Sequence, residues 1–201
     1  MKQLLLELYP MAEKMLIERF AGLVNTAYSE PWRHYHNMGH LNHCFKEYEQ
    51  VERVIINKNA VKLAIWYHDV MYLPGSKINE IASGDIAFVH LSILATDKMG
   101  YHVRRLIVGS RESDIRSDAR YFHDIDYSIL GQDRDIYVSY VEAIYKENGG
   151  LFDVKDIQAR RKVFLLKLLN KRIFHSEFFR DLYEQKAKAN VKYELDHPME
   201  V

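Results

Sequence analysis

The stretch Ala60-Val61-Lys62-Leu63-Ala64-Ile65-Trp66-Tyr67-His68-Asp69-Val70-Met71 decides the fold. Its side chains are apolar almost all the way round a helix, which is typical of a central buried helix rather than of a surface helix. The doublet His68-Asp69 lies inside this pattern. Because buried polar side chains need internal partners, we expect neighbouring helices to supply groups that satisfy the doublet.

Helical spacing of apolar residues precedes this stretch. One helix is predicted to begin at Pro10 and to end before Pro31, with Met11, Met15, Leu16, Leu23 and Val24 near one face. A second apolar stripe consists of Leu41, Cys44, Phe45, Tyr48, Val51 and Ile55. Both patterns predict helices with one apolar face.

Helical spacing also follows the stretch. Residues 72–76 are predicted to form a loop, and Asn79 is predicted to be the N-cap of a helix that ends near Gly100. Further helices are predicted at about 102–110, 119–130, 134–147, 156–174 and 177–191, with a break at Gly149-Gly150. Strand signals are scarce, so we expect an all-α helical bundle that forms a single domain over residues 1–201.

The composition excludes several classes of protein. Lys plus Arg equals Asp plus Glu at 28 each, so no overall positive field attracts long nucleic acid or an anionic membrane. Charges interrupt every apolar run before the roughly 18 residues that a membrane span needs, and the N-terminus breaks too soon for a signal peptide. A lone cysteine, Cys44, cannot form an internal disulfide. We expect a cytoplasmic protein that does not enter a membrane.

A histidine cluster, Arg33-His34-Tyr35-His36-Asn37-Met38-Gly39-His40, precedes the central stretch. If the second helix starts near residue 36, His36, His40 and His43 share one face. Imidazole and carboxylate groups hold borderline or hard divalent cations, so the cluster and the His68-Asp69 doublet predict a metal site between two helices. The alternative is a buried pair in which the Asp69 carboxylate accepts a hydrogen bond from His68.

Four ordered motifs give the chain a family resemblance. They are Arg33-x-Tyr35-His36-Asn37-x-x-His40, Tyr67-His68-Asp69-x-x-Tyr72, Asn79-Glu80-x-x-Ser83 and Asp124-x-Asp126-Tyr127-Ser128-Ile129-Leu130-Gly131, followed by matching positions as far as Asn190. The chain resembles the predicted metal-dependent phosphohydrolases of the HD superfamily. The resemblance implies an HD-domain-like helical fold with its metal between the central helices.

The resemblance also implies a ligand set of an early histidine, the His-Asp doublet and a late aspartate. These map onto His40, His68, Asp69 and Asp126, with His36 and His43 as alternatives for the early histidine. His36 is also a candidate for a supporting contact, and Asp124 for a direct ligand or an orienting group.

The resemblance implies a further histidine where this chain reads Gly109-Ser110-Arg111-Glu112-Ser113-Asp114. We therefore expect one ion, or a second one held by carboxylate and water. The metal, one of Mn, Fe, Co, Ni, Zn or Mg, is left open.

The implied activity is hydrolysis of a small phosphorylated molecule, such as a nucleotide or a phosphodiester, by metal-activated water. Asp69 is a candidate to take the proton from water, and Glu80 is a candidate general acid or base; alternatively, Glu80 only favours the first turn of its helix. Candidate substrate contacts are Arg33, Tyr72, Lys77, Asn79 and Arg111.

Two other functions stay open. One is a metal-containing sensor that binds nucleotide without turnover, and the other is a di-iron oxygenase-like enzyme on the same scaffold. The absence of the further histidine argues against the oxygenase. The partner expected is a small phosphorylated molecule, and the protein is expected to be a monomer or a homodimer.

Overall fold

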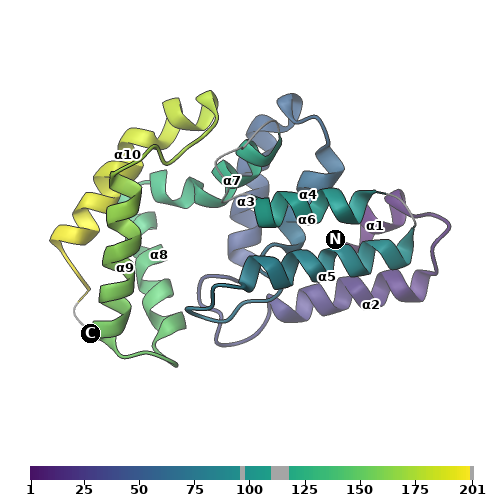
Figure 1. Cartoon of the computed structure of the whole chain (residues 1–201), viewed down its shortest axis with the longest axis horizontal. Helices are drawn as coiled ribbons and strands as arrows, with labels where there is room; N and C mark the ends of the chain where they lie inside the picture. Colours follow the sequence, from purple (N-terminus) through teal and green to yellow (C-terminus); the bar gives the residue numbers. More distant parts are fainter. Residues whose placement is uncertain (96–97, 110–117, 200–201) are drawn as a thin grey trace. The chain divides into compact units, whose positions relative to one another are not determined.

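The computed structural model describes residues 1–95, 98–109 and 118–199. Every regular element in these ranges is a helix, so the prediction of an all-α protein is confirmed (Figure 1). The chain divides into two compact units, Met1–Phe122 and His123–Val201, and each is described by itself. The prediction that the whole chain forms a single domain stays a prediction.

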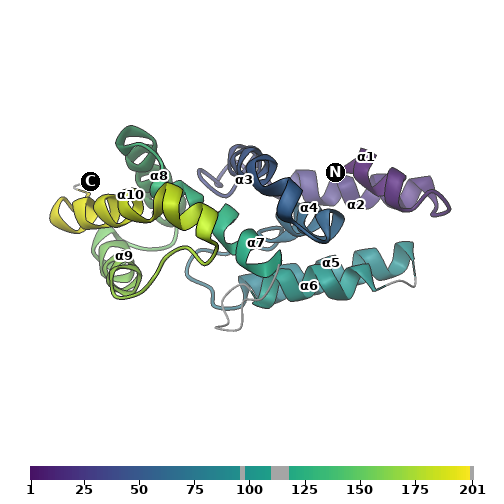
Figure 2. The same cartoon turned by 90° about the horizontal axis from the view of Figure 1, so that it is seen from above.

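The first unit holds the central helix. Its elements are α1 (Lys2–Leu8), α2 (Lys14–Ala27), α3 (Met38–Val51), the short 3-10 helix η1 (Glu52–Val54), α4 (Lys58–Tyr67), α5 (Asn79–Leu94), α6 (Met99–Gly109) and the start of α7 (Asp118–Tyr127). Helix α4 packs against α3, α5 and α6, and Figure 2 shows the α5–α6 pair on one side of it. Leu63, Ala64 and Ile65 are fully buried, which confirms the prediction of a central buried helix.

The position of the His-Asp doublet differs from the prediction. Helix α4 ends at Tyr67, so His68 caps its C-terminal end and Asp69 lies beyond it. The Asp69 N–H would continue the helix by bonding to the Ile65 carbonyl, but it donates to the Tyr28 hydroxyl instead, at 3.0 Å. The Ile65 carbonyl accepts from His68 Nδ1, at 2.9 Å. Two side chains therefore form hydrogen bonds with the backbone N–H and carbonyl groups that a continued helix would pair with each other.

The predicted first helix is wrong in its start and its buried face. Helix α2 begins at Lys14 rather than at Pro10, and Met11 and Met15 are 96% and 71% exposed. The buried positions are Ile17, Phe20 and Val24, a spacing of three and four that defines one helical face. A turn in which the Ala12 N–H donates to the Tyr9 carbonyl precedes the helix.

The second unit surrounds a buried ion pair. Its elements are the end of α7, the 3-10 helix η2 (Ser128–Gly131), α8 (Arg134–Asn148), α9 (Val154–Leu169) and α10 (Glu177–Asp196). The break at Gly149-Gly150 is confirmed between α8 and α9. Arg161 of α9 donates two hydrogen bonds of 2.8 Å to Glu194 of α10 and one to Tyr140 of α8. This pairing satisfies two buried charges and ties three helices together.

We predict that Gly131→Ala destabilises the second unit. A Cβ at Gly131 would collide with the Cβ and Cγ of Tyr183 on α10, and Asn190 Nδ2 holds this approach in place through the carbonyls of Leu130 and Gln132. Overpacking of this kind costs about 1–3 kcal/mol, which a urea denaturation curve measures. Gly22→Ala is the control, because no atom lies within 4 Å of a Cβ there and alanine favours a helix by up to about 1 kcal/mol. A Gly131→Ala protein as stable as the wild type would contradict the prediction.

We also predict that acid destabilises the contact between α2 and α5. Phe20 stacks on His90 with ring centroids 4.1 Å apart, and burial together with the charge of Arg19 lowers the pKa of His90. The unfolded chain, with a histidine pKa of about 6.5, then takes up the proton more readily. The stability contribution is complete above pH 6.5 and is lost as the pH falls below it.

The melting temperature should accordingly be lower at pH 5 than at pH 7.5. His90→Gln should reduce that difference, whereas His102→Gln, at an exposed position of α6, should leave it in place. An equal pH dependence in wild type and His90→Gln would show that His90 does not contribute.

Candidate metal centre

The start of α3 sets the position of the early histidine. Asn37 is the N-cap, and its Oδ1 accepts a hydrogen bond of 2.8 Å from the Gly39 N–H. Its Nδ2 donates to the carbonyls of Arg33 and His34, so the segment before the helix is held against the first turn. The helix starts at Met38, which leaves His36 before it and places His40 in the first turn, buried and 3% exposed.

His40, His68 and Asp69 bring three ligand atoms together. Nε2 of His40 lies 2.9 Å from Nε2 of His68, and Oδ2 of Asp69 lies 3.1 Å from the His68 nitrogen and 3.7 Å from the His40 nitrogen. Ending α4 at Tyr67 allows adjacent residues to face the same point, which the interior of a helix does not. Three of the sequence-predicted metal ligands therefore converge.

This triangle fits a divalent cation. With metal–nitrogen bonds of about 2.1 Å, neighbouring ligands at right angles lie about 3.0 Å apart, which matches the 2.9 Å between the two nitrogens. The Ile65 carbonyl can only accept, so Nδ1 of His68 carries the proton and Nε2 of the neutral ring presents a lone pair. The C-terminal end of α4 adds partial negative charge. Geometry, tautomer and local field all suit a cation.

The backbone of Asp69 is clamped from both sides. Arg33, whose side chain is 2% exposed, donates from Nη1 to the Asp69 carbonyl at 2.6 Å and from Nη2 to the Val70 carbonyl at 3.2 Å. The Tyr28 hydroxyl accepts from the Asp69 N–H, and burial and the Asp69 charge raise the pKa of Tyr28 well above its usual value. Arg33 also pairs with Glu30 through Nε. These contacts give Arg33 a positioning task, and its contact with substrate stays a prediction.

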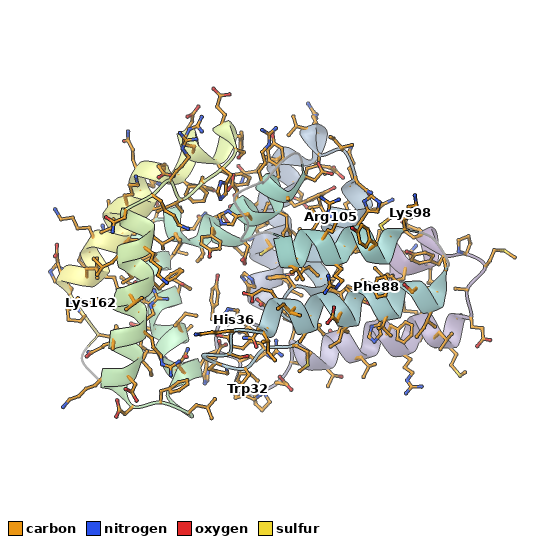
Figure 3. All side chains as sticks on the ribbon, in the orientation of Figure 1. Trp32, His36, Phe88, Lys98, Arg105 and Lys162 are labelled. Atoms are coloured by element: carbon orange, nitrogen blue, oxygen red, sulfur yellow. The ribbon has the colours of Figure 1, made fainter. Side chains whose placement is uncertain are left out.

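His36 lies beside the ligand triangle, with Nε2 4.0 Å from Oδ2 of Asp69. Its ring stacks on Tyr72 with centroids 3.9 Å apart, and Tyr72 in turn stacks on Trp32. Trp32 is 37% exposed, and it lies close to His36 in Figure 3. The aromatic row therefore leads from Asp69 to the surface, and the supporting contact expected of His36 stays a prediction.

Cys44 is a site residue that the sequence analysis did not nominate. Its Sγ lies 3.7 Å from Nε2 of His40, and ligand atoms of His40, Cys44 and His68 all lie within 4.8 Å of one another. The signal was the spacing of four between His40 and Cys44, which places both on one helical face. The sequence predicts Cys44 only as a member of an apolar stripe and as a cysteine that cannot form an internal disulfide.

The two late aspartates belong to the second unit. Asp124 is fully buried and accepts hydrogen bonds from the N–H groups of His175 and Ser176, at 2.8 and 2.6 Å, with His123 Nδ1 a further 3.1 Å contact. Asp124 thereby holds the segment that leads into α10. Asp126 lies near the end of α7, and its role as a metal ligand stays a prediction.

The loop after the doublet is fastened to α5. Asn79 accepts from the Leu73 N–H and donates to the Leu73 carbonyl, so it closes the loop rather than capping the helix. The N-cap is Ile78, and the prediction of Asn79 in that position is wrong by one residue. Lys77 is exposed in this loop, and Glu80 lies in the first turn of α5.

The substrate contacts proposed for Asn79 and Lys77, and the catalytic role of Glu80, stay predictions. Arg111 and the segment 110–114, which lacks the expected histidine, lie outside the described residues.

No known protein family, characterised protein or solved structure matches the chain in the comparisons. Among the helices of the described residues, none combines the length and the hydropathy needed to cross a membrane.

Proposed function

We propose that the protein is a metal-dependent phosphohydrolase that acts on a small phosphorylated molecule, with nucleotides and phosphodiesters as the leading substrate classes. The observation that carries the proposal is the convergence of His40, His68 and Asp69 within 3.7 Å of one another. The HD-like order of the sequence motifs supports the same activity. Cys44 is buried, and as the one cysteine of the sequence it cannot form a disulfide within the chain, which suits a reducing compartment; we therefore place the protein in the cytoplasm.

A divalent cation held by these three residues would supply acidified water and a polarised phosphoryl oxygen. The Asp69 carboxylate is the acceptor for the proton of the attacking water, and the His36 side chain beside it keeps that carboxylate oriented. The clamp of Arg33 and Tyr28 fixes the Asp69 backbone, which limits the motion of its carboxylate. Lys77 in the adjoining loop is the cation assigned to the substrate phosphate, and Glu80 is assigned to protonate the leaving group.

A phosphate-release screen tests the proposal. Metal-stripped protein is given Mn, Co, Ni, Zn, Mg or Fe(II) in turn and is offered nucleotides and an aryl phosphodiester. Release that requires metal and disappears in Asp69→Ala is the expected result. Nucleotide binding without release would favour the metal-containing sensor instead.

The second candidate, an iron-dependent oxygenase, rests on one specific observation. Two histidines and one carboxylate form the ligand face, which is also the set that non-haem iron enzymes use. Stoichiometric iron, with oxygen consumption and no phosphate release, would favour this candidate. A colourless protein without iron would exclude it.

A further inference from the structure

Helix α5 is apolar on both of its faces, although only one face is covered. Toward the core it presents Ala87, Leu91 and Leu94, which are at most 8% exposed. On the opposite side, a ridge of apolar side chains is 41–62% exposed; it consists of Ile78, which precedes the helix, and of Ile81, Phe88, Val89 and Ile93. A helix that is hydrophobic all round normally lies in a core. The ridge therefore has the composition of an interface.

The ridge is extended by its neighbour α6. A Cβ on Gly100 would lie 2.9 Å from the carbonyl oxygen of Phe88, so the two helices touch at this point, and Tyr101 follows Gly100 on α6. Tyr101 is 54% exposed. With side chains of this size about half exposed, the apolar surface amounts to roughly 500 Å². That is most of the roughly 800 Å² per partner that a stable dimer buries.

Four of the five ridge residues are placed symmetrically about a point near the middle of α5, and Phe88 is the exception. The midpoint between Ile78 and Ile93 falls between residues 85 and 86, and the midpoint between Ile81 and Val89 falls at residue 85. If a second copy of this helix packs antiparallel to the first, the apolar side chains at each end of one helix contact apolar side chains of the other. A two-fold axis requires this kind of self-complementary surface. A partner of different sequence has no reason to share this symmetry.

The charges near that midpoint are compatible with self-association. Asp85 is the acidic residue of the ridge, and it already accepts a hydrogen bond of 2.6 Å from Arg104 Nε. Two copies of Asp85 near a two-fold axis are therefore each neutralised within their own chain.

We propose that the exposed ridge of α5 is a homodimer interface, in which two copies of the chain pack through antiparallel α5 helices. This surface is separate from the ligand triangle, so its failure would leave the proposed phosphohydrolase function untouched.

Sedimentation velocity of the full chain over a range of concentrations tests the interface. Wild type should sediment as a dimer, and Val89→Glu should raise the dissociation constant at least 10-fold. Val163→Glu is the matched control, because Val163 on α9 is 55% exposed and Val89 is 51% exposed; it should remain dimeric. Wild type that is monomeric throughout, or a dimer that Val89→Glu leaves intact, would overturn the proposal.

A second measurement does not depend on the folding of Val89→Glu. Asp85→Cys places a thiol near the two-fold axis, so mild oxidation should link two chains through a disulfide between these cysteines. Ser139→Cys on α8, also outside the ridge, should link far less. Equal linking of the two variants would overturn the antiparallel arrangement.

Discussion

Asp69→Ala should abolish metal binding while leaving the fold intact. The substitution removes the carboxylate that lies 3.1 Å from Nε2 of His68 and 3.7 Å from Nε2 of His40. Residues that only orient a ligand are worth about 10–100-fold in affinity, so losing a ligand should weaken binding by more than about 100-fold. Titration of the metal-stripped protein with Zn²⁺ or Co²⁺ measures the change, and circular dichroism checks the helix content.

His34→Ala is the control for this experiment. His34 belongs to the same histidine cluster, but it is exposed. Its replacement by alanine should change the metal affinity by less than about 3-fold. Asp69→Ala protein that still binds one ion tightly would remove Asp69 from the ligand set. If His34 proved essential and His40 dispensable, the histidine assignment on α3 would be wrong.

Arg33→Ala should weaken both the fold and the metal site. Without the guanidinium, the carbonyls of Asp69 and Val70 lose their donors, and each buried unsatisfied group costs about 1–3 kcal/mol. We expect the free energy of unfolding to fall by about 2–4 kcal/mol. Because the same donors hold the Asp69 backbone, metal affinity of the protein that remains folded should fall by about 10–100-fold.

Two variants separate positioning from simple destabilisation. Arg53→Ala removes an exposed arginine of η1 and should change neither quantity. Arg33→Lys retains the charge but cannot reach both carbonyls in the same way, so it should recover only part of the affinity. A loss of stability with unchanged metal affinity in Arg33→Ala would mean that Arg33 serves the fold alone.

The central helix could be predicted from the sequence because burial on all sides leaves a direct mark on composition. Its polar interruption pointed to His68 and Asp69, and the family resemblance implied His40, with His36 and His43 as alternatives. These features can be predicted because they depend on neighbouring residues or on residue type, both of which are visible in the sequence. The loop at 72–76 and the break at Gly149-Gly150 were predictable for the same reason, since glycine and proline act on the backbone where they stand.

The end of α4 could not be predicted in this way. It depends on Tyr28 and Arg33, which lie 41 and 36 residues before Asp69 in the chain, and on how their side chains compete for backbone groups. Nothing near His68 in the sequence marks a helix end. The buried face of α2 was predicted wrongly because Met11 and Met15 fit a helical spacing. Met11 precedes the helix, and the side chain of Met15 is exposed. Cys44 was not predicted as a site residue because a cysteine within an apolar stripe fits an ordinary core position equally well.

The most direct test of the metal centre is a crystal structure of the protein grown with a divalent transition metal, with anomalous data collected at that metal's absorption edge. The account predicts a peak within about 2.0–2.3 Å of Nε2 of His40, Nε2 of His68 and a carboxylate oxygen of Asp69. The same map would reveal whether Asp126 or Cys44 completes the ligand set. A map without a peak at these three residues, from crystals of protein that binds metal in solution, would contradict it.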